Sequence, residues 1–307
     1  MNKTTRYTVL ILIILLSIIT VASASAEIIQ NDYVIISYNE EDRVVASTIL
    51  DNFSKIVSDV NREVGFYDIP AVQLVLTHSK KEFDQYITQG NLPENSIAMA
   101  IPSLYKIIVM NPKKLPPHTE FYKVITHEYL HLVLHSIAPI KHLPLWFEEG
   151  FVQYYADEWN INREMNFVTE ALKGNMLELQ SYSYHYPEQK SRVVIFYLQS
   201  YYNFRYLIKR FGVQKLYEFI DKLHLGEDFN VSFMQVFGMS VTSFLETAKK
   251  SISSHTIMAL LYSGLGLFWI IIPILLILAY LRKQRYRRKL EAIWENEEQD
   301  ALSGKLP

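Results

Sequence analysis

The sequence predicts an α+β protein in which a mixed α/β lobe with a small sheet is followed by a mostly helical lobe and a C-terminal transmembrane helix. Two observations predict the lobes: short β-like runs alternate with helical stretches up to about residue 110, and from about residue 120 nearly every stretch has a helical pattern. Strands followed by helices are typical of an α+β fold. A third observation, a long uncharged apolar run near the C-terminus, predicts the transmembrane helix.

The N-terminus has the pattern of an export signal. Lys3 and Arg6 precede an apolar run at residues 9–21, and residues 22–26 are the small residues that a signal peptidase recognises. We therefore expect residues 1–26 to be a cleavable signal peptide. The alternative is a membrane helix that stays uncleaved, and in both cases the chain that follows lies outside the cytoplasm.

The α/β lobe follows the signal. Four short apolar runs predict its strands, at residues 33–37, 72–77, 96–101 and 106–110. Residues 42–64 place apolar side chains near a 3.6-residue period, which predicts an amphipathic helix that packs on the sheet. A short helix is expected at residues 81–87, after a plausible capping residue at Ser79.

The first helix of the second lobe carries the pentapeptide His127-Glu128-Tyr129-Leu130-His131. Residues four apart on a helix project from one face, so both imidazoles can reach a single ion at roughly 2.0–2.1 Å. Glu128 is offset around the helix, where it can reach a metal-bound water without becoming a ligand. A general base for hydrolysis needs this placement.

The surroundings of this motif favour a metal site. Two histidines and a glutamate buried in an apolar helix are costly unless a metal compensates them. A third ligand from the same segment is not expected, because Leu134 and Ile137 hold the positions at which a glycine and a histidine would be needed. His135 lies about 12 Å along the axis from His127, too far to share its ion, and is expected to pack or to support the ligands.

A carboxylate ligand is instead expected from the next helix, which begins after Pro144. Glu149 lies 18 positions beyond His131, far enough for an antiparallel helix to return its carboxylate to the ion. This helix reads Trp146-Phe147-Glu148-Glu149-Gly150. Here the sequence resembles the gluzincin (peptidase MA-like) zinc metallopeptidases, in which H-E-x-x-H is followed by a helix with W-x-x-E-G-x-A-like residues.

The resemblance implies a zincin-like fold and a zinc ion bound by His127, His131 and Glu149, with Glu148 either a surface residue or a residue that supports the ligands. The departures are Glu148, where some members have asparagine, and Val152, where alanine is common. Neither removes a ligand. In this family the strand before the motif helix often offers its edge to an extended substrate, which here implies residues 98–101.

The resemblance also implies an oxyanion donor, Tyr197, on a helix downstream of the third ligand. A positioned hydroxyl aimed at the developing negative charge can contribute several kcal/mol to catalysis. The alternative is that Tyr197 is a core tyrosine, since further tyrosines follow it closely, at 201, 202 and 206.

The C-terminal part predicts the membrane topology. Residues 257–281 are 25 residues without a charge. As a helix they span about 37 Å, enough for a hydrocarbon core of about 30 Å. We therefore expect a transmembrane helix at 256–281. The basic residues that follow it, from Arg282 to Lys289, place a tail at 282–307 in the cytoplasm and a peptidase domain at 27–255 outside it.

The composition excludes several alternatives. The chain has no cysteine, so disulfides, thiol nucleophiles and thiolate metal ligands are impossible. Its formal net charge of −2 gives no basic surface for nucleic acid.

The sequence therefore predicts a single-pass cell-membrane zinc metallopeptidase that hydrolyses peptides or proteins near the cell surface, with Glu128 as general base. Two alternatives stay open: a tethered peptidase-like binding or sensory protein without catalysis, and a zinc hydrolase of a non-peptide envelope polymer. The oligomeric state is not predicted.

Overall fold

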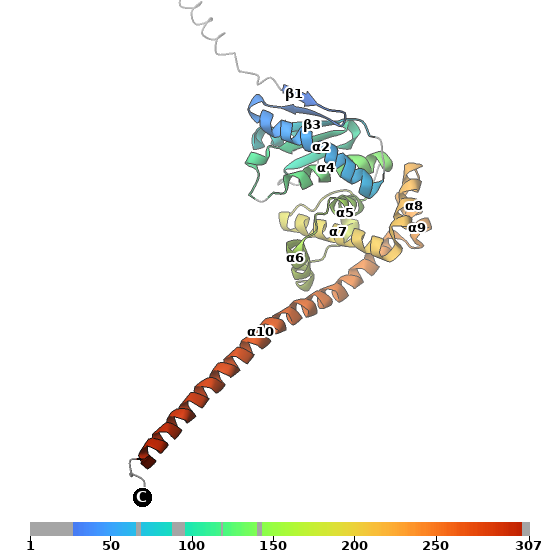
Figure 1. The fold of residues 1–307 in the computed structure, drawn as a ribbon. Coiled ribbons are helices and arrows are strands. Elements are labelled where there is room, and N and C mark those ends of the chain that lie inside the picture. Colours follow the sequence, from blue (N-terminus) through green and yellow to red (C-terminus); the bar gives the residue numbers. More distant parts are fainter. Residues whose placement is uncertain (1–26, 66–68, 88–95, 118, 140–142, 303–307) are drawn as a thin grey trace, which may run out of the picture. The chain divides into compact units, whose positions relative to one another are not determined.

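The computed structural model describes residues 27–65, 69–87, 96–117, 119–139 and 143–302, with the backbone alone at 253–270 and 296–302. The chain divides into two compact units after Ala248. The first unit starts with a sheet and its helices and continues with helices, which confirms the predicted α+β class (Figure 1). Its helices are α2 (Arg43–Val64), α3 (Lys80–Ile87), α4 (Phe121–Ile137), α5 (Leu145–Tyr155), α6 (Ile161–Leu172), α7 (Lys190–Phe211), α8 (Val213–His224) and α9 (Phe229–Phe237).

Five strands form the sheet, in the order β1-β2-β3-β5-β4. The three inner strands run parallel, and each edge strand pairs antiparallel with its neighbour. Their bounds are β1 (Glu27–Gln30), β2 (Val34–Tyr38), β3 (Val72–Thr77), β4 (Ala98–Ile101) and β5 (Lys106–Met110). Four of them lie where the sequence predicts them, which confirms those assignments.

The edge strand β1 is not predicted by the sequence. It has four residues and directly follows the predicted signal peptide, so it is too short for an alternating pattern to stand out. Asn31 makes the turn into β2, because its side-chain oxygen accepts the N–H groups of Tyr33 and Val34. The resulting hairpin places β1 at the edge of the sheet.

Helices cover both faces of the sheet. Ile107 of β5 belongs to the main hydrophobic core together with Phe53 of α2, whereas the next residue of the strand, Ile108, packs with Phe83 of α3 in a second cluster. Successive side chains of a strand point to opposite faces, so α2 and α3 lie on different sides. Ser79 caps α3 as predicted, since its hydroxyl accepts an N–H from the first turn.

The edge strand β4 has one open side. The N–H of Met110 donates to the carbonyl of Ile97, so these two residues form a hydrogen-bonded pair between the strands. Such pairs alternate along an antiparallel ladder, which turns the backbone N–H and C=O groups of Ala98 and Ala100 away from β5. Helix α4 packs beside this edge.

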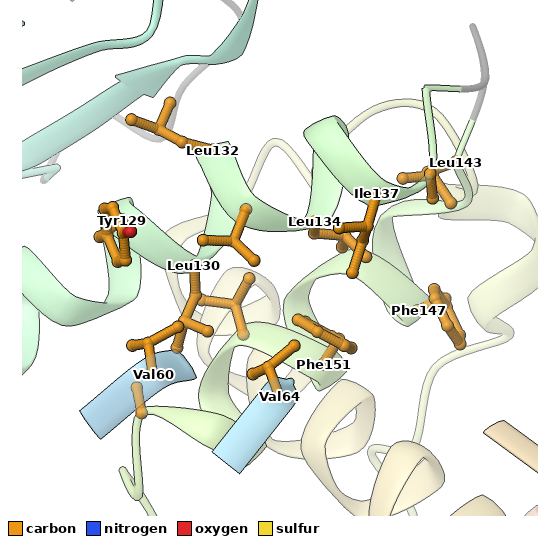
Figure 2. Packing of buried hydrophobic residues seen from close by; sticks show 14 of the residues in the cluster. Val60, Val64, Tyr129, Leu130, Leu132, Leu134, Ile137, Leu143, Phe147 and Phe151 are labelled. Carbon is orange, nitrogen blue, oxygen red and sulfur yellow. The ribbon is translucent and has the colours of Figure 1, made fainter. Parts of the chain in front are cut away.

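Helix α4 is buried between α2 and α5. Figure 2 shows part of this core, in which Leu130 and Leu134 of α4 cluster with Val60 and Val64 of α2 and with Phe151 of α5. Burial of a leucine or phenylalanine side chain stabilises a fold by about 1.5–3 kcal/mol. The helix that carries the H-E-x-x-H motif is therefore held firmly by its apolar side chains.

Helices α5 and α7 approach each other closely at Gly150. A β-carbon at this position would lie 2.5 Å from the backbone oxygen of Ser200 and 2.7 Å from the β-carbon of Phe204. Only glycine permits this approach, which brings the Tyr197 turn of α7 to the helix that carries Glu149.

Helix α10 (Val241–Leu302) enters the second unit at Lys249. The predicted signal peptide at 1–26 lies outside the described residues, and much of the predicted membrane span at 256–281 falls on residues whose side chains are not described. Among the residues that the structure describes, no helix is long and apolar enough to cross a membrane. The predicted transmembrane helix thus has no support from the structure and stays a prediction.

Candidate metal centre

Helices α4 and α5 bring the three predicted ligands together. The Nε2 atoms of His127 and His131 lie 3.3 Å apart, and Oε2 of Glu149 lies 3.6 Å from Nε2 of His127. One donor atom from each residue falls within 4.8 Å of the other two. Two ligands bound at 2.0–2.1 Å to one tetrahedral ion are ~3.4 Å apart, so the observed spacing suits a single ion.

The donor set also fits a metal chemically. Oε2 of Glu149 is buried and has no hydrogen-bond partner among the described residues. Such an atom is costly unless a cation compensates it. Two imidazole nitrogens and one carboxylate oxygen form the ligand set of many catalytic zinc sites. The three residues present therefore fit a zinc ion.

Each ligand histidine is held at its second ring nitrogen by a carboxylate. Nδ1 of His127 lies 2.6 Å from Oε1 of Glu158, and Nδ1 of His131 lies 2.9 Å from Oε1 of Glu148. These contacts orient both rings so that their Nε2 atoms face the same point. Of the two roles expected for Glu148, the structure shows the supporting one, since its side chain contacts His131 and it is not among the three candidate ligands.

Glu158 is itself held by Arg163, a contact that the sequence does not predict. A guanidinium N–H of Arg163 donates to Oε2 of Glu158 at 2.8 Å, and another donates to the side chain of Gln153 at 2.7 Å. Gln153 in turn donates to the backbone oxygens of Glu149 and Tyr197. This chain of contacts links the first ligand to both α5 and α7.

His135 does not reach the three ligands and packs as a supporting residue. Its Nε2 lies 2.9 Å from the same Glu148 oxygen that contacts His131. The two histidine contacts lower the pKa of Glu148 well below its usual range, although burial acts in the opposite direction. Glu148 is therefore ionised and adds negative charge beside the ligands.

The protonation of His127 and Glu149 depends on their burial and on the charged groups around them. Burial acts to lower the pKa of His127, but the surrounding carboxylates, with Glu158 foremost, raise it to about 10. For Glu149, burial raises the pKa and outweighs the neighbouring imidazoles. In the absence of an ion, His127 therefore keeps a proton that a metal must displace.

Glu128 lies next to the trio, at the open edge of β4. It is 9% exposed, and the backbone N–H of Ala100 hydrogen-bonds to it. Burial raises the pKa of Glu128, while both ligand histidines and the Ala100 N–H act in the opposite direction. Its carboxylate faces the same cleft as the ligands but is not one of them.

Two tyrosines complete the site, of which the sequence predicts only Tyr197. Its ring lies 5.9 Å from that of Tyr186. Tyr186 donates its hydroxyl to Oε1 of Glu149 at 2.5 Å. Burial, followed by the charge of Glu149, raises the pKa of both tyrosines well above the usual value. Both hydroxyls therefore stay protonated, and the proton of Tyr186 is donated to Glu149.

The three candidate ligands, Glu128 and the two tyrosines face one cleft of about 1030 Å³. The edge of β4 forms one wall, and α7 with the segment at 185–190 forms the other. The trio and Glu128 lie between them on α4 and α5. The edge of β4 and the candidate metal centre thus border the same cleft.

Comparison with known families agrees with this geometry. The model of the Peptidase MA superfamily matches residues 106–254, which run from β5 to the beginning of α10. No curated protein matches the chain. The match confirms the predicted resemblance to gluzincin-like peptidases and includes all three candidate ligands.

Proposed function

We propose that the chain is a membrane-anchored zinc metallopeptidase whose catalytic domain lies outside the cytoplasm. One observation carries the enzymatic part: His127, His131 and Glu149 converge beside an acidic group, Glu128, in a cleft bordered by an open strand edge. The Peptidase MA match supports the peptidase class. A binding protein without catalysis has no chemical need for both the three ligands and a base.

The chemistry is divided among the side chains of the site. When bound there, zinc would supply a Lewis acid that lowers the pKa of water and polarises a peptide carbonyl. Glu128 accepts a proton from the attacking water and later passes it to the leaving amine. The raised pKa of Glu128 favours this second, acidic role. Tyr197 donates its hydroxyl to the oxygen that gains negative charge.

The open edge of β4 positions the peptide. The N–H and C=O of Ala98 and the C=O of Ala100 face the cleft side, where an extended chain can pair with them. Recognition through backbone groups depends little on the side chains of the substrate. We therefore expect cleavage of extended or unfolded peptide segments.

The anchoring rests on the sequence. An export signal at 1–26, an uncharged run at 257–281 and the basic residues after it favour a single-pass protein with an exterior domain. A protease added to intact cells should then digest the domain at 27–255 and leave a tag at the C-terminus protected. Loss of that tag instead would contradict the orientation.

The replacement Glu128→Gln tests the mechanism. The full-length variant should bind zinc as the wild type does, because Glu128 is not a ligand. Hydrolysis of a peptide library should fall about 10²–10⁴-fold, since the variant cannot accept a proton. Zinc content and cleavage products, measured before and after a chelator, check both expectations.

The outcomes separate the three candidate functions. Unchanged cleavage by Glu128→Gln would refute the role of this residue. Hydrolysis of envelope polymers but not of peptides by the wild type would favour the non-peptide hydrolase. Peptide binding without any hydrolysis would favour the tethered binding protein.

A further inference from the structure

The third candidate ligand is held by a tyrosine from outside the motif helices. Tyr186 lies in the segment between α6 and α7, and its hydroxyl donates to Oε1 of Glu149. The other carboxylate oxygen, Oε2, is buried without a hydrogen-bond partner among the described residues and lies 3.6 Å from Nε2 of His127. Oε1 also lies 3.9 Å from Nε2 of His131, but it accepts the Tyr186 hydroxyl, whereas Oε2 accepts no hydrogen bond from the described residues. The two oxygens of one carboxylate thus have different environments.

We propose that Tyr186 is a positioning residue that fixes the Glu149 carboxylate through Oε1 and so presents Oε2 to the metal. This inference rests on the proposed function, because it requires Glu149 to be a ligand. A carboxylate on a flexible glutamate side chain can rotate, and either oxygen can bind. One strong hydrogen bond to Oε1 removes this freedom and selects the binding oxygen.

The hydroxyl of Tyr186 is itself well fixed. Its ring contacts Phe196 of α7 edge-on at 5.8 Å and lies beside Tyr197. The backbone carbonyl of Ser183 accepts the N–H of Leu145, the first residue of α5, at 2.8 Å. The segment that carries Tyr186 is therefore tied to the start of the helix that carries Glu149, and the contact joins two anchored groups.

A different role for Tyr186 is that of a donor to the substrate oxygen. The structure favours the positioning role, because the single proton of the hydroxyl is already engaged by Glu149. The two roles differ in what they predict for zinc binding. A positioning residue changes the affinity for the metal, whereas an oxyanion donor changes the turnover of the zinc-loaded enzyme.

The test compares three hydroxyl deletions in the full-length protein: Tyr186→Phe, Tyr197→Phe and Tyr182→Phe. Tyr182 is the matched control, because its ring also contacts Phe196 and no hydrogen bond joins it to Glu149. The zinc dissociation constant is measured by competition with a chromogenic chelator. Loss of a group that orients a ligand typically weakens metal binding 10–100-fold, so about that loss is expected for Tyr186→Phe. The other two variants should bind zinc as the wild type does.

A zinc affinity of Tyr186→Phe equal to that of the wild type would overturn the proposal, even if its turnover fell. Thermal unfolding of the metal-free proteins shows whether each variant is folded, so that weak binding by an unfolded chain is not counted as support. If Tyr186→Phe does not fold, Glu149→Gln, which keeps an oxygen that accepts the Tyr186 hydroxyl, should still bind zinc less tightly. Equal binding by that variant would show that Glu149 is not a ligand, which contradicts the proposed function as well as this proposal. A folded wild-type chain that binds no zinc would instead contradict the proposed function itself.

Discussion

Two carboxylates determine how the ligand histidines act. Glu158 and Glu148 each contact an Nδ1 atom, so both imidazoles present Nε2 to the same point. A carboxylate behind a ligand histidine fixes its ring and makes it more basic. The same contact raises the pKa of His127 to about 10, so the metal-free site holds a proton at neutral pH. In the proposed zinc site, metal binding and proton release are therefore coupled.

This coupling gives a prediction at pH 8. There the metal-free His127 is charged, because its pKa of about 10 lies above the pH, whereas a zinc ligand must be neutral. Zinc binding should therefore release at least about one proton per ion. Calorimetric titration in two buffers with different ionisation enthalpies measures this release. The variant Glu158→Gln, which removes the main cause of the raised pKa, should release fewer protons. Equal release by both proteins would contradict the assignment.

At the scale of single residues, the sequence predicts what local spacing determines. His127 and His131 share a helix face, and Glu149 follows within the next helix, so their convergence can be expected from short-range geometry. Glu158 and Tyr186 could not be predicted in this way. Neither belongs to a periodic pattern, and Tyr186 is one of 21 tyrosines. Their roles depend on how the segments after α5 and α6 return to the site.

At the scale of elements, the site depends on how closely α5 and α7 pack. Gly150 follows the third ligand directly and faces the backbone of α7. Its missing side chain lets Tyr197, Phe196 and the nearby Tyr186 approach the ligand helix. In the W-x-x-E-G pattern, the glutamate is thus the candidate ligand. The glycine after it permits the close helix contact that brings the two tyrosines near that ligand.

The variant Gly150→Ala tests this contact. Alanine in a helix is normally more stable than glycine, but here its β-carbon would lie 2.5 Å from a backbone oxygen. Overpacking of this kind costs about 1–3 kcal/mol, so the free energy of unfolding should fall. Zinc binding should weaken too, since α5 must shift. Denaturant unfolding and chelator competition measure both effects.

The matched control is Asn166→Ala on the exposed face of α6. It changes helix propensity without a steric conflict, so its effect should stay within about 0.5 kcal/mol. A Gly150→Ala protein as stable as this control would show that the two helices are less tightly packed than described.

The elements themselves were predictable where their patterns are long. Helix α2 has an apolar face over 22 residues and agrees with its predicted range within one residue. Strand β1 has four residues and depends on a hairpin turn at Asn31, so no periodic pattern reveals it. The order of the strands in the sheet was not predictable from local patterns, because pairing between distant segments determines it.

At the scale of the whole molecule, one cleft combines elements from both lobes of the first unit. The α/β lobe supplies the open edge of β4, α4 and α5 supply the ligands and Glu128, and α7 with the segment before it supplies the two tyrosines. The Peptidase MA match begins at residue 106 and leaves out β1 to β4. Strand β4, which borders the cleft, therefore lies outside the matched residues.

The most direct test is a crystal structure of the full-length protein with zinc, with the ion located by its anomalous scattering. One ion is expected within roughly 2.0–2.2 Å of Nε2 of His127, Nε2 of His131 and an oxygen of Glu149. A stoichiometric ion held instead by Glu148 and His135, with the Glu149 carboxylate turned away, would contradict this expectation. A zinc-soaked crystal with no ion between the two imidazoles would contradict it as well.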